Sequence, residues 1–487
     1  MSAERQQNSD GQLDLFRTAS EAALCPGATG ADGIPSGARE ESQTLAAAMQ
    51  GRALACEDLM ERVAALGNLH RAMKAVRRNK GAGGVDGMTV DELEPWFAAN
   101  WKALRDALLT GTHKPHPVSG VEIPKPSGGT RQLGIPTVVD RLVQQAILQV
   151  LEPLLDPTYS DASFGFRPGR SAHQALRRAQ QYVGEEERCI VVDLDLEKFF
   201  DRVNHDILMA RLARRVADKR LLKIVRRFLE TGMMAGGVCV RREEGTPQGG
   251  PLSPLLANLL LDDLDKELES RGHRFCRYAD DCNIYVRTQA AGERVMASVT
   301  KFLEEKLRLR VNREKSAVAH VGERKFLGYR LLSKGRLIVA PQSWKRLKER
   351  VRAITRRNRG VAASRIISEL NSFLMGWVTY FQLAECKARL TKMDEWVRHK
   401  LRCYRLKQLK RRSAMIRYFT ARGVNRDLAV TTASSGKGWW RLSNSPATKW
   451  AMNNARLAKA GLRSLTIRYL MLRGNETAGC DIARPVV

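Results

Sequence analysis

The stretch Phe275-Cys-Arg-Tyr-Ala-Asp-Asp-Cys-Asn-Ile-Tyr-Val286 sets two adjacent aspartates between two short runs rich in strand-forming residues. This pattern predicts a β-hairpin with Asp280 and Asp281 at its tip. Carboxylate oxygens on short side chains suit the rigid octahedral shell of Mg²⁺. An Asp-Asp pair alone is weak evidence for a metal site, because many such pairs lie in ordinary turns.

A second acidic segment lies upstream, at Cys189-Ile-Val-Val-Asp-Leu-Asp-Leu-Glu-Lys-Phe-Phe-Asp201. If it forms a strand, apolar residues occupy one face and Asp193, Asp195 and Glu197 occupy the other. A row of carboxylates repels itself unless cations bind there. From this segment alone, a solvated edge strand is the alternative. Together with the hairpin, it predicts carboxylates for two metal ions, the arrangement that phosphoryl transfer uses.

The charge of the chain points to a polyanionic partner. Its 487 residues carry a formal net charge of +30, and 43% of them are hydrophobic. No stretch approaches the roughly 18 to 20 apolar residues of a membrane-spanning helix, and no signal peptide is evident. The nine cysteines are scattered without a Cys-x-x-Cys pair, so we expect reduced thiols. We therefore expect a cytoplasmic nucleic-acid-binding protein with no membrane partner.

The composition changes along the chain. The first 55 residues are rich in Ala, Gly, Ser, Glu and Gln and are expected to be a disordered leader. We predict a first domain over residues 56–335, in which short strands and helices alternate from about residue 115 onward. Residues 341–420 contain 21 lysines and arginines against five acidic residues, a net charge of +16, with leucines at helical spacing. We predict a basic helical domain over 336–425 and a short basic C-terminal region over 426–487.

Several motifs resemble those of reverse transcriptases. Tyr278-Ala-Asp-Asp281 resembles the family signature, and Gly245-Thr-Pro-Gln-Gly-Gly-Pro-Leu-Ser-Pro254 resembles the loop that precedes it. Further blocks are similar to the reverse transcriptase/maturases encoded by bacterial group II introns, in order from about residue 60 to 475. These blocks are Ile123-Pro-Lys-Pro-Ser-Gly-Gly-Thr-Arg-Gln-Leu-Gly-Ile-Pro136, Asp140-Arg-Leu-Val-Gln-Gln145, Ser163-Phe-Gly-Phe-Arg-Pro-Gly-Arg170 and Phe326-Leu-Gly-Tyr329. The resemblance implies an α+β fold: right-hand polymerase fingers and palm, followed by an α-helical thumb/maturase domain.

The resemblance also implies which residues bind the metal ions. Asp195 corresponds to the first ligand, with the Leu196 carbonyl adding an oxygen, and it would act with Asp280 and Asp281. Asp193 does not have the family's spacing to the Phe-Phe-Asp run that ends at residue 201. The implied cofactor is a pair of Mg²⁺ ions, for which Mn²⁺ can substitute.

Three residues are expected to contact the incoming nucleotide from glycine-containing motifs. Lys125 and Arg131 flank Pro-Ser-Gly-Gly-Thr and would reach the triphosphate, Lys as a point charge and Arg as a fork. Contact with template phosphates is the alternative for both. Gln248 lies beside Gly249-Gly250, where small residues let the backbone approach a nucleotide.

Two further residues complete the expected nucleotide site. Phe200 corresponds to the steric gate that excludes a 2′-hydroxyl; the alternative, a core aromatic, suits Phe199 better. Lys315 resembles a lysine that protonates the leaving pyrophosphate, although it could equally be one more surface lysine.

The basic C-terminal half resembles the maturase domain through Phe-Leu-Met-Gly-Trp-Val-Thr-Tyr-Phe, residues 373–381. Lys and Arg interleaved with aromatic residues suit structured RNA. We interpret Trp377 as part of a helical core rather than as an RNA contact, and we assign RNA binding to surface charges. The predicted RNA-binding residues are Arg352, Arg356, Arg357, Arg359, Arg398, Arg402, Arg405 and Lys410.

Many relatives end in a His-Asn-His endonuclease with paired cysteines. After Arg412 this sequence has a single cysteine, Cys480, and no histidine, so it lacks the ligands for the metal site of such a nuclease. We therefore expect the form without that domain, with Trp439-Trp440-Arg441 and the basic helix that follows as a DNA-binding remnant. The resemblance implies an enzyme that copies intron RNA into DNA and helps that RNA to splice. Its partners would be intron RNA, an RNA template, a DNA primer or target, and dNTPs. The alternatives are a splicing-only maturase and a reverse transcriptase recruited to host defence.

Overall fold

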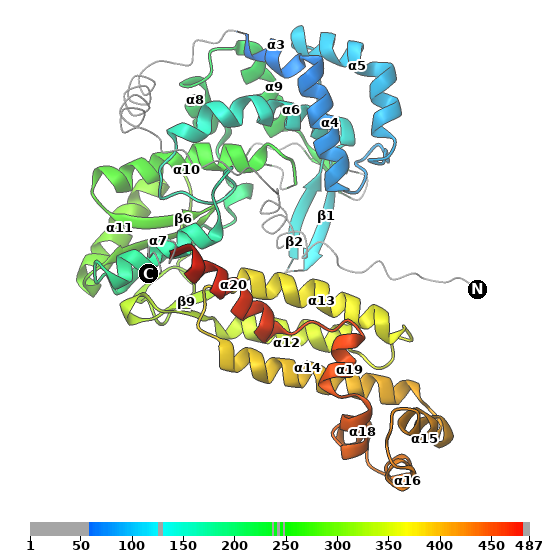
Figure 1. Cartoon of the computed structure of the whole chain (residues 1–487). Helices are drawn as coiled ribbons and strands as arrows, with labels where there is room; N and C mark the ends of the chain where they lie inside the picture. The colour runs from blue at the N-terminus through cyan, green and yellow to red at the C-terminus, as the bar shows by residue number, and fades with distance from the viewer. Residues whose placement is uncertain (1–57, 125–129, 236–237, 241–243, 247–248, 481–487) are drawn as a thin grey trace, which may run out of the picture. The chain divides into compact units, whose positions relative to one another are not determined.

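A computed structural model describes residues 58–124, 130–235, 238–240, 244–246 and 249–480 (Figure 1). The described residues divide into two compact units, of which one ends at Arg324 and the other begins at Lys325. The predicted disordered leader lies outside the described residues. No helix in the described part of the chain is long and apolar enough to cross a membrane.

The first unit, residues 58–324, contains helices around two small sheets. Its helices are α3 (Leu59–Ala64), α4 (Leu66–Asn79), α5 (Leu93–Leu109), α6 (Val138–Leu155), α7 (Ala172–Gly184), α8 (His205–Ala213), α9 (Lys219–Glu230), α10 (Ser253–Ser270) and α11 (Gln289–Lys306), with 3-10 turns at η1 (Asp156–Thr158) and η2 (Phe199–Asp201). One sheet has the order β2-β1-β4-β5, made of β1 (Val118–Pro124), β2 (Thr130–Ile135), β4 (Met233–Ala235) and β5 (Val238–Val240).

The second sheet of this unit carries both acidic segments. Its order is β6-β7-β3-β8, made of β6 (Arg274–Tyr278), β7 (Asp281–Val286), β3 (Ile190–Leu194) and β8 (Ala317–His320), and each neighbouring pair is antiparallel. The predicted hairpin is confirmed as β6-β7. The alternative of a solvated edge strand is wrong for β3, because β7 and β8 pair with it on both sides.

One continuous hydrophobic core joins the helices of the first unit to the second sheet. Val192 and Leu194 of β3 are 0% and 1% exposed, and the leucines of α10 are buried. α11 packs against β3, β7 and β8, and α7 packs against β6. Asp195 follows β3 and Asp280 and Asp281 lie where β6 turns into β7, and we call this end of the sheet the acidic edge. The core gives the acidic edge a rigid base.

The second unit is mainly helical. The hairpin of β9 (Tyr329–Leu331) and β10 (Leu337–Val339), with η3 (Ser333–Gly335) between them, is followed by helices. The first three are α12 (Pro341–Ile354), α13 (Ala363–Tyr380) and α14 (Lys387–Gln408). The others are α15 (Arg412–Thr420), α16 (Arg426–Ser434), α17 (Trp439–Leu442), α18 (Pro446–Ala451), α19 (Asn454–Lys459) and α20 (Leu465–Cys480).

Helix α20 packs on α13 and α14 of this unit. Figure 1 shows α20 lying along α13 and α14, and both helices contact it. Buried Asp394 of α14 accepts hydrogen bonds from Ser464 Oγ at 2.7 Å, Leu465 N at 2.9 Å and Thr466 N at 3.0 Å. These bonds satisfy backbone N–H groups at the start of α20. The two compact units divide between Arg324 and Lys325. The division into four parts that was drawn from the sequence stays a prediction.

Candidate active site

The β6-β7 hairpin presents its two aspartates at a tight turn. Tyr278 pairs with Asp281 at the end of the ladder, which leaves Ala279 and Asp280 as the two turn residues. Ala279 has a φ of +58°, a left-handed conformation that is uncommon for a residue other than glycine. Asp280 is half-buried and Asp281 is exposed.

Asp195 reaches the same edge of the sheet from β3. Leu194, the last residue of that strand, pairs with Cys282, so Asp195 follows β3 where Asp281 precedes Cys282. Antiparallel partners lie side by side, so the three predicted carboxylates share one edge. Among the described residues, however, no three His, Cys, Asp or Glu side chains converge closely enough to hold a metal ion as they stand. The backbone brings the predicted ligands together, and their side chains are not gathered around one point.

Asp195 is held by the turn that runs from Asn312 to Ser316. Asn312 N donates to the Asp195 carbonyl at 2.8 Å, and Asp195 N donates to Ser316 Oγ at 3.0 Å. The ammonium of Lys315 lies 3.5 Å from Asp195 Oδ2. The predicted lysine and the predicted first metal ligand are therefore neighbours.

Asp193 has a different partner. The guanidinium of Arg324 lies 2.7 Å from Asp193 Oδ2, and it also donates to the Lys315 carbonyl. Asp193 therefore has a fixed arginine as its counter-charge, whereas Asp195 faces a lysine on a long flexible stem. Sequence reasoning missed Arg324, because nothing in its local pattern distinguishes it from a surface arginine.

The backbone around Leu196 continues the pairing beyond the strand. Leu196 forms an isolated bridge with Val311, and Glu197 N donates to the Arg310 carbonyl at 2.9 Å. The segment after β3 is thus paired with residues 310–311. The Leu196 side chain is 6% exposed and packs into the core.

Phe200 and Phe199 have different environments. Phe199 is 3% exposed in the core, whereas Phe200 is half-buried, with the two rings 5.1 Å apart in an edge-on arrangement. The expected core role of Phe199 is therefore confirmed. Thr246 N donates to the Phe200 carbonyl at 2.6 Å, which joins Phe200 to the glycine-rich loop that starts at Gly245.

The glycines of this loop lie against other backbone segments. Gly249 has a φ of +134°, and a Cβ there would lie 2.5 Å from the Gly134 carbonyl oxygen of β2. A Cβ at Gly250 would lie 2.2 Å from Gln144 Oε1 of α6. The close approaches visible in the structure are therefore to protein atoms. The predicted Gln248 and Lys125 lie outside the described residues, and so does the side chain of Arg131.

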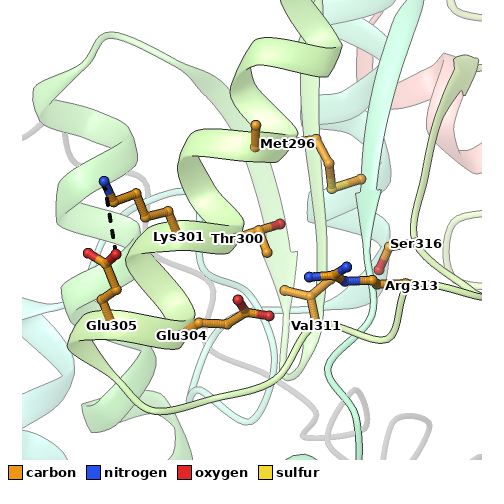
Figure 2. A pocket seen from close by; sticks show the side chains of 9 residues that line it. Met296, Thr300, Lys301, Glu304, Glu305, Val311, Arg313 and Ser316 are labelled. Carbon is orange, nitrogen blue, oxygen red and sulfur yellow. Dashed lines mark ion pairs between the residues drawn. The ribbon is translucent and has the colours of Figure 1, made fainter.

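A pocket of about 510 Å³ is lined by residues of α11 and by Val311, Arg313 and Ser316, and Figure 2 shows these side chains. Met296, Thr300 and Lys301 of α11 form one side, and Val311 and Ser316 form the other. Ser316 lines the pocket and also contacts the Asp195 backbone. None of Asp195, Asp280 and Asp281 lines this pocket, so it is distinct from the candidate active site.

The predicted RNA-binding residues of the second unit fall into two groups. Arg352, Arg356, Arg357 and Lys410 are exposed, and Arg398 and Arg405 are half-buried. The other two have protein partners. Arg359 forms two hydrogen bonds to Glu369, at 2.7 and 3.0 Å, and this carboxylate raises the pKa of Arg359. Arg402 is 9% exposed and donates to the Met452 carbonyl at 2.9 Å.

Aromatic side chains of this unit form clusters with one another and with cations. Trp377 packs between Trp344 and Phe381, with ring centroids 5.0 and 4.5 Å away, which supports its interpretation as a core residue. Trp440 stacks on His399 at 3.6 Å, and Lys400 lies 5.0 Å above the Trp440 ring. The predicted DNA-binding remnant thus contacts α14, the helix that carries three of the predicted RNA-binding arginines.

Two family models match the chain. Residues 123–331 match "Reverse transcriptase (RNA-dependent DNA polymerase)", and residues 344–420 match "Group II intron, maturase-specific domain". The second sheet with its acidic edge lies inside the first match, and the second match begins within α12 and contains α13 and α14. The predicted α+β fold, a right-hand polymerase fold followed by a helical thumb/maturase part, is confirmed.

Curated relatives agree with the family models. The protein YkfC of Escherichia coli (strain K12) is 34% identical over 306 residues, which cover 55% of this chain and 80% of YkfC. The group II intron-encoded protein LtrA of Lactococcus lactis subsp. cremoris is 36% identical over 189 residues, 39% of this chain. The matched part spans only 31% of LtrA.

Among solved structures, a chain titled "Partial Cas6-RT-Cas1--Cas2 complex" is 26% identical over 51% of this chain and 43% of its own length, with a TM-score of 0.34. A similarity at that score adds nothing to the assignment, which rests on the family models and on the curated relatives. The chain belongs to the family of group II intron-encoded reverse transcriptases and maturases.

Proposed function

We propose that this protein is an RNA-directed DNA polymerase that copies intron RNA into DNA by two-metal nucleotidyl transfer. We also propose that it binds its intron RNA as a maturase, which assists splicing and intron mobility. The observation that carries the proposal is the shared edge of the β6-β7-β3-β8 sheet, where Asp195 lies beside the turn of Asp280 and Asp281. A polymerase needs acidic residues from two neighbouring strands at one such edge.

The residues at this edge fit hard divalent cations. Asp195, Asp280, Asp281 and the Leu196 carbonyl offer only oxygen donors, which is the ligand chemistry that Mg²⁺ prefers and that Mn²⁺ accepts. Two bound ions would activate the primer 3′-hydroxyl and neutralise charge on the triphosphate. The protein's own part is to fix the backbone of Asp195, through hydrogen bonds to Asn312 and Ser316.

The remaining nucleotide contacts follow from position. Lys315, 63% exposed and 3.5 Å from Asp195, can donate a proton from Nζ to the leaving pyrophosphate. Phe200, held through its carbonyl by Thr246, would lie under the sugar and exclude a 2′-hydroxyl. Lys125 and Arg131 would bind the triphosphate, and Gln248 would contact the nucleotide from the glycine-rich loop.

The second unit supplies the RNA-binding surface in this proposal. Its exposed arginines and lysines give affinity for phosphates without demanding a fixed geometry. Stacked Trp440 and His399 add a place where an unpaired base can stack. We propose that the protein acts in the bacterial cytoplasm, and at the nucleoid when it is bound to DNA.

The rival functions are a splicing-only maturase and a reverse transcriptase recruited to host defence. The carboxylate edge favours the polymerase over the first, because RNA binding alone does not need Asp280 and Asp281 at a hairpin turn in which Ala279 has a left-handed conformation. The maturase-specific match at residues 344–420 favours an intron partner over the second.

Primer extension on poly(rA)/oligo(dT) tests the proposal, using full-length protein and the variants Asp280→Asn and Asp281→Asn. Both variants remove a charged ligand without changing side-chain size, so we expect extension to be abolished while the fold is kept. Asp106→Asn is a matched control on α5, with an exposed carboxylate far from the acidic edge in sequence. Near-normal extension by the two hairpin variants would contradict the metal assignment.

A further inference from the structure

Arg277, in the strand that leads into the hairpin turn, is 1% exposed. Its guanidinium forms a bidentate pair with Asp265 of α10, which is 0% exposed, at 2.7 Å from Nε to Oδ1 and 2.5 Å from Nη2 to Oδ2. A buried ion pair is weak evidence for a role in stability, because well-packed apolar residues often replace one without loss. The pair with Asp265 alone therefore does not explain why an arginine is buried at this position.

One of the other hydrogen bonds of Arg277 reaches the hairpin turn of the candidate active site directly. Nη1 donates to Asn258 Oδ1 at 3.0 Å and to the Ala279 carbonyl at 2.9 Å, and Nη2 donates to Ser163 Oγ at 2.7 Å. The Ala279 carbonyl belongs to the peptide group that joins Ala279 to Asp280. A donor on this oxygen fixes the orientation of the peptide from which Asp280 extends.

The backbone of Gly165 also confines Ala279, at its N–H group. A Cβ at Gly165 would lie 2.2 Å from Ala279 N, so the Gly165 backbone lies directly against the turn. Asn258 holds both sides, because its Oδ1 accepts from Arg277 and its Nδ2 donates to the Gly165 carbonyl at 2.9 Å. Ala279 keeps its left-handed conformation between these two fixed neighbours, and such a conformation persists only where its surroundings enforce it.

We propose that Arg277, oriented by Asp265, is a positioning residue that sets the direction of Asp280 and thereby the metal affinity of the acidic edge. This inference rests on the proposed polymerase function. Lysine cannot replace Arg277 in this role, because one ammonium cannot match the planar fork that reaches Asp265, Asn258, Ser163 and Ala279 together.

The test separates positioning from stability with two variants of the full-length protein. The double variant Arg277→Met with Asp265→Leu replaces the ion pair by apolar residues of similar size, and Arg277→Lys keeps the charge but loses the fork. The matched control is Arg215→Met with Asp262→Leu. That pair also joins an arginine to α10, at 2.5 Å, and its arginine donates in addition to Thr158, which lies outside the hairpin.

Four quantities are measured for each protein: the melting temperature, the Kd for primer–template, the extension rate against Mg²⁺ concentration, and Mn²⁺ binding by electron paramagnetic resonance. For both Arg277 variants we expect extension to fall about 100-fold at fixed Mg²⁺, the effect of a reacting group displaced by about 1 Å. We also expect several-fold weaker Mn²⁺ binding with an unchanged Kd for primer–template. The control pair should keep the wild-type rate and the wild-type Mn²⁺ affinity.

A folded double variant with wild-type extension and Mn²⁺ binding would overturn the inference, because the ion pair would then be only structural. If both Arg277 variants fail to fold, Asn258→Ala decides, since it removes a hydrogen bond on each side of Ala279 and leaves the ion pair in place. Unchanged Mn²⁺ affinity in that variant would also overturn the inference, and weaker binding would support it. A wild-type protein that cannot extend a primer would instead refute the proposed function itself.

Discussion

The two units of the molecule use arginine in opposite ways. In the first unit, Arg277 is buried and its guanidinium is fixed by bonds to four residues around one turn. In the second unit, Arg356 and Arg357 are exposed and belong to a stretch of net charge +16 over residues 341–420. The first arrangement provides position and the second provides charge density. Chemistry at a phosphorus atom needs the former, whereas affinity for a folded RNA needs mainly the latter.

The largest effect should come from separating the two units by mutation. An Asp280→Ala protein should lose DNA synthesis completely and still promote splicing of its own intron at low magnesium, because RNA binding does not depend on the carboxylate edge. Splicing is measured with the intron transcript, and extension with poly(rA)/oligo(dT). If this variant folds and binds intron RNA normally but gives no splicing above the protein-free rate, the separation of the two activities between the two units is wrong.

The opposite separation, in which splicing is lost and DNA synthesis is kept, should be less complete. Changing Arg398, Arg405 and Lys410 to Gln should leave extension on a generic template near normal, because none of them belongs to the first unit. Splicing should fall strongly, because three cations that can neutralise RNA phosphates are removed at once. Arg402→Gln is kept apart as a control for packing, since Arg402 is buried on the Met452 carbonyl. Loss of primer extension in the triple variant would show that the division of labour is wrong.

Phe200→Ala should change the selectivity of the first unit for dNTP over rNTP and leave RNA binding by the second unit unaffected. Removing the half-buried ring should make room for a 2′-hydroxyl and lower the preference for dNTP over rNTP by about 10- to 100-fold. Phe199→Leu is the matched control, because Phe199 is a core residue and should affect stability without changing selectivity. Single-nucleotide incorporation with dTTP and UTP measures both. An unchanged preference in Phe200→Ala would assign the gate to another residue.

The smallest effect should appear in the salt dependence of RNA binding. Neutralising exposed Arg352, Arg356 and Arg357 should reduce the slope of log K against log salt by about 2 to 3, close to one unit for each phosphate that the protein no longer neutralises. Arg359→Gln should change the slope less, because Glu369 already neutralises this arginine. Filter binding from low to high salt measures the slopes. Equal slopes for the triple variant and the wild type would place the RNA footprint elsewhere.

Local patterns were enough to predict the hairpin, the alternation in β3 and the positions of the three aspartates at one edge. Period-two alternation and the motif order carry that information within the chain itself. The partners of Asp193 and Asp195 could not be predicted, because Arg324 and Ser316 lie 131 and 121 residues away from them in the sequence. Arg277 left a weak signal as a charge inside a strand whose neighbours are apolar. The burial of Arg402 also left no local signal, since its partner carbonyl lies fifty residues away.

The buried carboxylate of Asp394 has a consequence for the order in which the chain folds. Its three donors belong to residues 464–466, which leave the ribosome long after α14 has been made. Until then, Asp394 has to stay hydrated or remain buried without donors, at a cost of about 1–3 kcal/mol or more for a charged group. The helical unit therefore completes its folding only after residues 464–466 have been made. Any shortened version that stops before residue 464 should be more easily digested by proteases than the full chain.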